Sequence, residues 1–214
     1  MRILAGLALA AAGSASWAQS YAFNFDFDTD SEGWTRGSIA SNRALFNITN
    51  TPVNYNAGLG LIEGSDWDNY AYFFSSDFGG ANFSDLYGEV LSYDFRSQGS
   101  GGNNPQVVLV STNDFLVFSQ PITASPVLET YAMTLSDSQG WTFNGAPYYS
   151  NGSAATEAQM RSVLGELRYI GISTDIVSGG DFTQLDNVKA TPEPGLLAAL
   201  GIGAAAAWRR KRKA

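Results

Sequence analysis

The chain is punctuated by short runs in which bulky apolar residues alternate with small or polar ones. Such alternation places every second side chain on one face of a β-strand, and the Gly-, Ser-, Asn- and Asp-rich spacers between the runs indicate turns. The runs most typical of strands are YAFNFDF (21–27), RALFNIT (43–49), NYAYFF (69–74), EVLSYDFR (89–96), QVVLV (106–110), DFLVF (114–118), ETYAMTL (129–135), RYIGIS (168–173) and DFTQLDNV (181–188). Many short strands at this spacing predict an antiparallel β-sandwich or barrel.

One segment departs from this period of two. Thr156 and Gln159 are spaced as a helix capping box. Apolar residues then recur at i, i+3, i+4 and i+7, namely Met160, Val163, Leu164 and Leu167. Because that spacing puts them on one helical face, we expect a short helix that covers one open end of the sandwich. The expected fold class is therefore all-β with one short helix.

The composition excludes several kinds of chemistry, because the chain contains no His and no Cys. Ser–His–Asp and Cys–His catalysis, thiolate zinc sites, His-ligated haem and disulfides all require these residues. Residues 19–190, which suit a single domain, contain six basic and nineteen acidic side chains. Their net charge of −13 argues against binding to nucleic acid. What remains is carboxylate chemistry, hard cations such as calcium, and recognition by aromatic or polar surfaces.

Residues 1–18 are organised like a secretory signal peptide. Arg2 precedes an apolar run over 3–12, and the small residues Ser16 and Ala18 stand at positions −3 and −1 of a cleavage site. An amphipathic first helix is the alternative, but the run is apolar on all sides and contains no acid. We therefore expect the protein to be exported.

The other end of the chain, 191–214, combines three features. The tripeptide Pro192-Glu193-Pro194 is followed by a fourteen-residue apolar stretch, 195–208. The chain then carries five consecutive cations: Arg209, Arg210, Lys211, Arg212 and Lys213. The apolar stretch is shorter than the ~17–25 residues of an ordinary spanning helix, and the cations would stay cytoplasmic. A solvated basic tail on a buried core helix is the alternative to this membrane segment.

Taken together, the tripeptide, the apolar segment, the terminal basic cluster and the signal peptide resemble the PEP-CTERM sorting signal. The resemblance implies processing by exosortase, a membrane transpeptidase-like protease of Gram-negative bacteria that make extracellular polysaccharide. It implies a precursor anchored in the inner membrane and a product at the cell surface or in the extracellular biofilm matrix. The two prolines hold the motif extended, a form that a protease can bind.

The body, from about residue 67 to residue 188, is similar to the laminin B domain, also called laminin IV type A. The matching stretches are YFFSSDFGGANFSDLYGEVLSYDFR (72–96), VVLVSTNDFLVF (107–118), ETYAMTLSDSQGW (129–141), TEAQMRSVLGELRYIGISTD (156–175) and LDNV (185–188). The resemblance implies a jelly-roll sandwich like those of carbohydrate-binding modules, and it implies no catalysis. Within LDNV, we expect Leu185 and Val188 to point into the sandwich, with Asp186 and Asn187 near the edge of the final strand.

Acidic residues are densest in DFDTDSE (26–32), where alternation would place the carboxylates on one face of a strand, about 6–7 Å apart. Carboxylate oxygens are the ligands that calcium prefers. Sandwiches of the carbohydrate-binding type often carry a structural calcium that joins an acid of the first strand to an Asp of the last. The resemblance therefore makes Asp28 and Asp186 candidate calcium ligands. A solvated acidic strand edge is the alternative.

Sugar binding requires exposed aromatic rings beside polar groups. Trp67, which stands between Asp66 and Asp68 in an expected loop, is the first candidate, followed by Tyr148 and Tyr149. The alternative for Trp67 is a packed position at the start of a strand, because tryptophan is highly buried on average.

The sequence thus favours an exported, non-catalytic protein that adheres to or organises extracellular polysaccharide. The alternative from another class is a secreted polysaccharide-active enzyme, whose two carboxylates would stand about 5–9.5 Å apart. A matrix protein with no ligand is a third interpretation.

Overall fold

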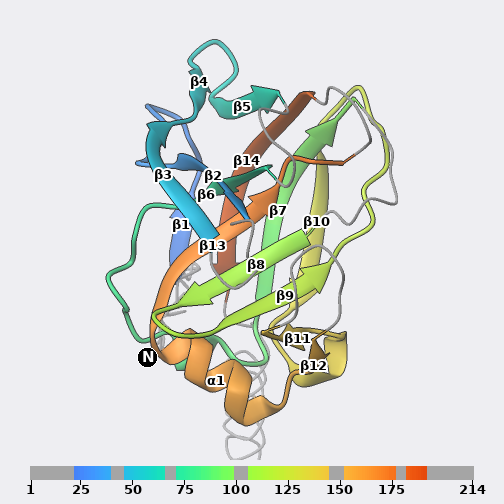
Figure 1. Ribbon diagram of the computed structural model, residues 1–214. Helices are drawn as coiled ribbons and strands as arrows, with labels where there is room; N and C mark the ends of the chain where they lie inside the picture. The colour runs from blue at the N-terminus through green and yellow to red at the C-terminus, as the bar shows by residue number, and fades with distance from the viewer. Residues whose placement is uncertain are drawn as a thin grey trace, which may run out of the picture.

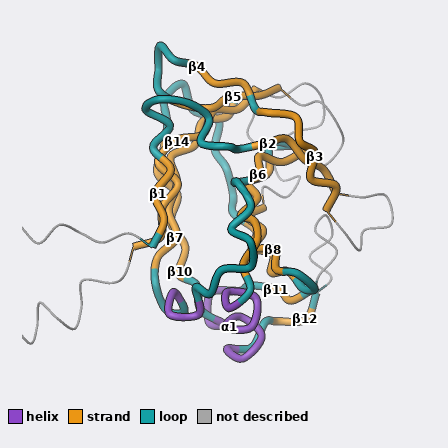
Figure 2. The backbone as a smooth tube through the Cα atoms, turned by 90° about the vertical axis from the view of Figure 1, so that its left-hand side faces the viewer, coloured by secondary structure: helices purple, strands orange, loops and turns teal. Residues whose placement is uncertain are grey.

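The computed structural model describes residues 22–39, 46–65, 71–98, 106–144, 152–176 and 182–191. Their strands form two antiparallel sheets that pack face to face (Figures 1 and 2). This arrangement confirms the expected all-β sandwich with a single α-helix in the described part of the chain.

The first sheet contains six strands: β1 (Phe23–Phe25), β4 (Asn54–Asn56), β5 (Leu61–Ser65), β7 (Val90–Ser97), β10 (Glu129–Thr134) and β14 (Phe182–Thr191). Their order is β10-β7-β14-β5-β4, and β1 also pairs with β14.

The second sheet contains eight strands: β2 (Thr35–Ile39), β3 (Phe46–Pro52), β6 (Ala71–Phe74), β8 (Gln106–Ser111), β9 (Phe115–Ser119), β11 (Thr142–Phe143), β12 (Ser153–Ala154) and β13 (Leu167–Ser173). Their order is β12-β11-β9-β8-β13-β6-β2-β3, so the chain crosses between the two sheets several times.

Strand β14 is flanked on both sides. Along one side it pairs with β7, from Thr183 to Thr191. Along the other side β5 pairs with its first half, as far as Leu185, and β1 pairs with residues 188–190 of its second half. The register shifts between Asp186 and Lys189, where one partner strand gives way to the other. Asp186 and Asn187 consequently lie in the middle of a central strand, which corrects the expected position near its edge.

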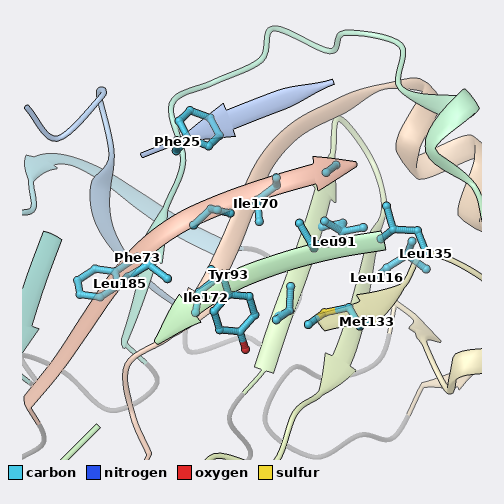
Figure 3. Close-up of a cluster of buried hydrophobic side chains, with 14 of the residues drawn as sticks. Phe25, Phe73, Leu91, Tyr93, Leu116, Met133, Leu135, Ile170, Ile172 and Leu185 are labelled. Carbon is cyan, nitrogen blue, oxygen red and sulfur yellow. The ribbon is translucent and has the colours of Figure 1, made fainter. Parts of the chain in front are cut away.

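The core between the sheets is built by the inward side chains of both (Figure 3). Tyr93 and Phe95 of β7 and Leu185 of β14 face Phe73, Leu116, Ile170 and Ile172 of the second sheet. Leu185 and Val188 are both fully buried, as expected. Trp141 is also fully buried, and its indole N–H donates to the Thr134 carbonyl at 3.0 Å.

Helix α1 (Glu157–Gly165) lies across one end of the sandwich (Figure 1). Its capping box is formed as predicted: the Gln159 N–H donates to the Thr156 hydroxyl, and the Gln159 side chain accepts from the Thr156 N–H. Met160, Val163 and Leu164 are buried beneath the helix. Leu167, expected on the same helical face, is buried too, but it is the first residue of β13, because the helix ends at Gly165. The helix contacts β8, β9 and the short 3-10 helix η1 (Ser84–Leu86), while a second 3-10 helix, η2 (Asp137–Gln139), follows β10.

The strand expected over 21–27 ends at Phe25, and the acidic segment after it is a loop. Its carboxylates accept hydrogen bonds from nearby backbone amides: Asp26 from the Asp28 N–H, Asp30 from the Glu32 N–H, and Glu32 from the Phe27 N–H. Phe27 and Glu32 adopt positive φ angles of 50° and 47°. The prediction of carboxylates along one strand face was therefore wrong, because Asp side chains that bond to the backbone favour turns.

Candidate functional site

The six-stranded sheet presents polar side chains on its outer side, here called the polar face. Alternation along the strands explains this: Tyr93, Phe95 and Leu185 enter the core, so their neighbours point away from it. The polar face consists of Asn56, Glu63, Asp94, Arg96, Thr130, Gln184, Asp186 and Asn187.

One hydrogen-bonded row crosses four strands of the polar face, β7, β14, β5 and β4. The Arg96 Nη1 donates to the Gln184 Oε1 at 3.0 Å, and the Gln184 Nε2 donates to the Glu63 Oε2 at 3.1 Å. The same Glu63 oxygen accepts from the Asn56 Nδ2 at 3.2 Å. Gln184 is only 5% exposed, so its amide is held in one orientation by partners on both sides. The row therefore fixes an ordered sequence of donors and acceptors.

A second group surrounds the bulge of β14. Asn187 adopts a φ of 51°, and its backbone N–H donates to the Asp186 Oδ1 at 2.7 Å. Its side-chain Nδ2 donates to the Asp94 Oδ2 at 2.9 Å and to the Asp186 Oδ2 at 3.1 Å. Asp94 also accepts from the Thr130 hydroxyl at 2.6 Å. The bulge thus turns one amide toward two carboxylates.

The Asp186 carboxyl is electrostatically disfavoured as an anion. Burial raises the pKa of Asp186 to about 6, the Asn187 backbone N–H lowers it, and the carboxylates of Asp94, Asp28 and Asp26 raise it further. Asp28 and Asp186, the two carboxylates predicted from the sequence, lie within electrostatic reach of each other in the fold. Asp94 was not predicted, although it stands at a polar position of the alternating run 89–96.

Calcium at Asp28 and Asp186 stays a prediction. Asp28 is exposed in the loop after β1, and its backbone carbonyl accepts from the Tyr55 hydroxyl at 3.0 Å. Across the described residues, no group of three or more acidic, His or Cys side chains is placed to hold a metal ion. The oxygens of Asp94 and Asp186 that face each other are bonded to the amide of Asn187 instead.

Several predicted site residues lie outside the described residues. These are the aromatic candidates Trp67, Tyr148 and Tyr149, the tripeptide Pro192, Glu193 and Pro194, and the basic cluster Arg209, Arg210, Lys211, Arg212 and Lys213. Within the described ranges, none of the helices has the length and apolar character needed to cross a membrane.

The outer side of the eight-stranded sheet has the opposite chemistry. Tyr72 and Phe74 of β6, Val108 of β8, and Phe115 and Val117 of β9 form a second hydrophobic cluster, here called the apolar outer cluster. Each of these side chains is at most 8% exposed. Gly171 of β13 makes room for it, because a Cβ there would meet Phe74 and Val108 at 2.5 Å.

Two family models match the chain. Laminin B (domain IV) matches residues 81–192, just over half of the chain, and the PEP-CTERM protein-sorting motif matches residues 190–212. The motif match thus begins inside β14 and implies recognition by exosortase. Neither matched family is catalytic. No curated protein matches the sequence.

Solved structures share the fold at low sequence identity. The L4b domain of human laminin α-2 has a TM-score of 0.57 and 13% identity, over 74% of this chain and 92% of that domain. The agarase AgWH50C has a TM-score of 0.50 and 14% identity, over 79% of this chain. An exo-β-agarase has a TM-score of 0.50 and 11% identity, over 82% of this chain. This chain spans only 26% of either agarase.

The sandwich, the family matches and the laminin-domain likeness agree with one another, and the sorting motif indicates an exported surface protein. The chain belongs to the laminin B (domain IV) family and ends in a PEP-CTERM protein-sorting motif.

Proposed function

We propose that this protein is a non-catalytic component of the cell surface or extracellular matrix that associates with polysaccharide through the polar face. The observation that supports this most is the ordered row of Asn56, Glu63, Gln184 and Arg96. Fixed amide, carboxylate and guanidinium groups offer donors and acceptors at defined positions, which is what the hydroxyls of a sugar chain require. The partly exposed Asp94 of β7 and the exposed Thr130 of β10 extend these groups across the sheet.

The net negative charge of the body limits the kinds of polysaccharide that the protein can bind. Residues 19–190 carry a net charge of −13, and on the polar face Arg96 stands against three acids, Glu63, Asp94 and Asp186. A polyanionic chain would be repelled by this field, because like charges across an interface cost free energy. The proposed ligand is therefore a neutral glycan.

The proposed route to the surface begins with export and a precursor held in the inner membrane by residues 195–208. Exosortase then acts at Pro192-Glu193-Pro194. The support is the family match to the sorting motif and its place at the C-terminus of the chain. Mass spectrometry of the mature C-terminus tests this route. Loss of RRKRKA is expected, and a mature surface protein that retains it would contradict sorting.

Binding is tested with an array of neutral and acidic glycans and three proteins: the wild type, Gln184→Ala and Asp77→Asn. The first variant breaks the row on the polar face, and the second changes an exposed carboxylate on the loop after β6, beside the other sheet. We expect neutral glycans to bind the wild type and Asp77→Asn equally, and Gln184→Ala about tenfold more weakly, equivalent to about 1.4 kcal/mol. Equal binding by all three proteins would place the ligand elsewhere.

One observation favours the enzyme alternative. The Asp94 Oδ2 and Asp186 Oδ2 both accept from one nitrogen, at 2.9 and 3.1 Å, so they cannot be more than about 6 Å apart. This upper limit admits the carboxylate spacing of retaining glycosidases, and the raised pKa of Asp186 is typical of a general acid. Against it, the Asn187 amide fills the space where a sugar carbon would react. A reducing-sugar assay decides: turnover that is lost in Asp186→Asn would replace the binding proposal with a catalytic one.

A further inference from the structure

The junction between the folded body and the sorting segment has no spacer. Strand β14 runs to Thr191, which pairs with Val90 of β7, and the next residue is Pro192. The family match to the sorting motif begins at Ala190, so it includes the last two residues of the paired strand. One segment therefore belongs both to the sheet and to the sorting signal.

The end of β14 is held from two sides. Ala190 pairs with Leu91 of β7 and with Phe23 of β1, and its carbonyl accepts from the Ala22 N–H at 3.2 Å. The Ala190 side chain is fully buried. Figure 2 shows β1, β14 and β7 side by side. The chain before β1 and the chain after β14 thus meet the body at the same end of the sandwich.

Chain length limits how far this end can stand from a membrane. Four residue steps separate Thr191 from Gly195, where the apolar stretch begins, and they span at most about 14 Å when extended. The polar headgroup layer takes about 5–7 Å of that length. Less than about 10 Å then remains between the lipid surface and the sandwich, whereas a small protein domain is about 30 Å across.

We propose that unpairing of the last residues of β14 from β1 and β7 gives the sorting protease access to its motif. This inference rests on the proposed sorting function. Cleavage breaks one backbone C–N bond; the carbonyl half, attached to the body, passes to water or to an acceptor amine. The new N-terminus stays with the apolar segment. With the strand paired, only four residue steps separate its last residue from the apolar stretch. Release of residues 189–191 adds about 10 Å of free chain.

The test follows the C-terminal processing of the full chain by pulse-chase in cells that contain exosortase. A flexible nine-residue Gly-Gly-Ser spacer between Thr191 and Pro192 adds about 15–18 Å of average reach. We expect it to speed processing about tenfold. The matched control places the same insert between Ala57 and Gly58, in the exposed turn between β4 and β5, and leaves the rate unchanged.

The converse variant locks the strand. Val90→Cys with Thr191→Cys places two cysteines directly opposite each other in the register, in a chain that otherwise has none. We expect the oxidised pair to slow processing about tenfold without the spacer and to have no effect with it; Val90→Ser with Thr191→Ser is the control. A rate that is independent of either the spacer or the crosslink overturns the inference. Absence of cleavage in every protein, the spacer variant included, would instead contradict the proposed sorting function.

Discussion

The two sheets share one core but differ on their outer sides. On the six-stranded sheet, the outward positions of β5, β7 and β14 carry Glu63, Arg96 and Gln184, joined by hydrogen bonds. On the eight-stranded sheet, the outward positions of β6 and β8 carry Phe74 and Val108, which are fully buried. Only the six-stranded sheet therefore follows the usual pattern of an antiparallel sandwich, with one apolar and one solvated face. The other sheet is apolar on both faces along β6, β8 and β9.

The two sheets also differ in the pKa of a carboxylate that lies beside each of them, Asp77 and Asp186. The Arg168 side chain, which is bonded to Asp77 through two nitrogens, lowers the pKa of Asp77 to about 2. The partial burial of Asp186 raises its pKa to about 6. Asp77 is paired with a cation from β13, whereas Asp186 lies near other acids. As the pH rises, the ionised Asp77 therefore stabilises the fold and the ionised Asp186 destabilises it.

The largest effect is expected from Phe74→Ala in the apolar outer cluster. Removal of a fully buried ring that stacks on Tyr72 at 5.6 Å should lower the free energy of unfolding by about 3–5 kcal/mol, as in an ordinary core. Urea denaturation measures this. The matched variant Leu185→Ala tests the core between the sheets. If Phe74→Ala costs less than about 1 kcal/mol, the outer cluster does not behave as a second core.

Gly171→Ala should come next. Its new Cβ would lie 2.5 Å from atoms of Phe74 and Val108, so the sheet must shift or the side chains must leave their rotamers. Overpacking of this kind costs about 1–3 kcal/mol. Thermal unfolding provides the measurement, and the control is Gly171→Ala combined with Val108→Ala, which removes one of the two clashing side chains. Wild-type stability in the single variant would show that the cluster is loosely packed.

On the polar face, Asp186→Asn should stabilise the protein at neutral pH. The folded-state pKa of Asp186 is raised from 3.8 to about 6, so the folded state binds the proton more tightly than the unfolded state. The wild type therefore loses stability as the pH rises from about 4 to about 6, and the variant does not. Because Asp186 is partly solvated, we expect a gain of about 1 kcal/mol at pH 7 and none at pH 3.5.

Calcium provides the control for that experiment. If Asp28 and Asp186 bind the ion, millimolar calcium should raise the melting temperature of the wild type at pH 7 and leave Asp186→Asn unchanged. Isothermal titration of the wild type should then also release or absorb heat. No heat and no rise in melting temperature would remove the calcium prediction and leave the pH prediction intact.

Asp77→Asn should have the smallest effect. The folded-state pKa of Asp77 is lowered from 3.8 to about 2, so its stabilisation is present above pH 4 and is lost as the pH falls through about 2. The pair with Arg168 is solvent-exposed, with side chains 40% and 32% accessible, so the loss at pH 7 should be below about 1 kcal/mol. Denaturation at low and high salt tests this; a loss that does not shrink with salt would contradict a screened surface pair.

Alternation and burial coincide most clearly in β7, where Leu91, Tyr93 and Phe95 enter the core between polar neighbours. Strands β6, β8 and β9 also lie where strands were expected, although consecutive residues along them are buried. Five strands were not predicted from the sequence, namely β2, β4, β5, β11 and β12. Strand β2, TRGSI, shows no apolar alternation, and β11 and β12 are two residues each, too short for any period to appear.

For the candidate site, sequence reasoning reached Asp28 and Asp186 but not their surroundings. Asp94 and Gln184 acquire their roles from pairing between strands far apart in the chain, which no local pattern reports. The bulge at Asn187 could not be predicted either, because it arises where β1 replaces β5 beside β14. The alternation of acids over 26–32 was a false strand signal, since those side chains bond to turn amides.

The antiparallel neighbours β1 and β14 also determine how the domain would respond to force. A force that separates the start of β1 from the end of β14 breaks their hydrogen bonds one after another, because Phe23 and Ala190 are directly opposite each other. A pull between Thr191 and the far end of the six-stranded sheet runs along β14 and loads its bonds to β7 in parallel. A protein that is held at its C-terminus and bound at the sheet surface would therefore withstand a much larger force along β14 than a force that separates β1 from β14.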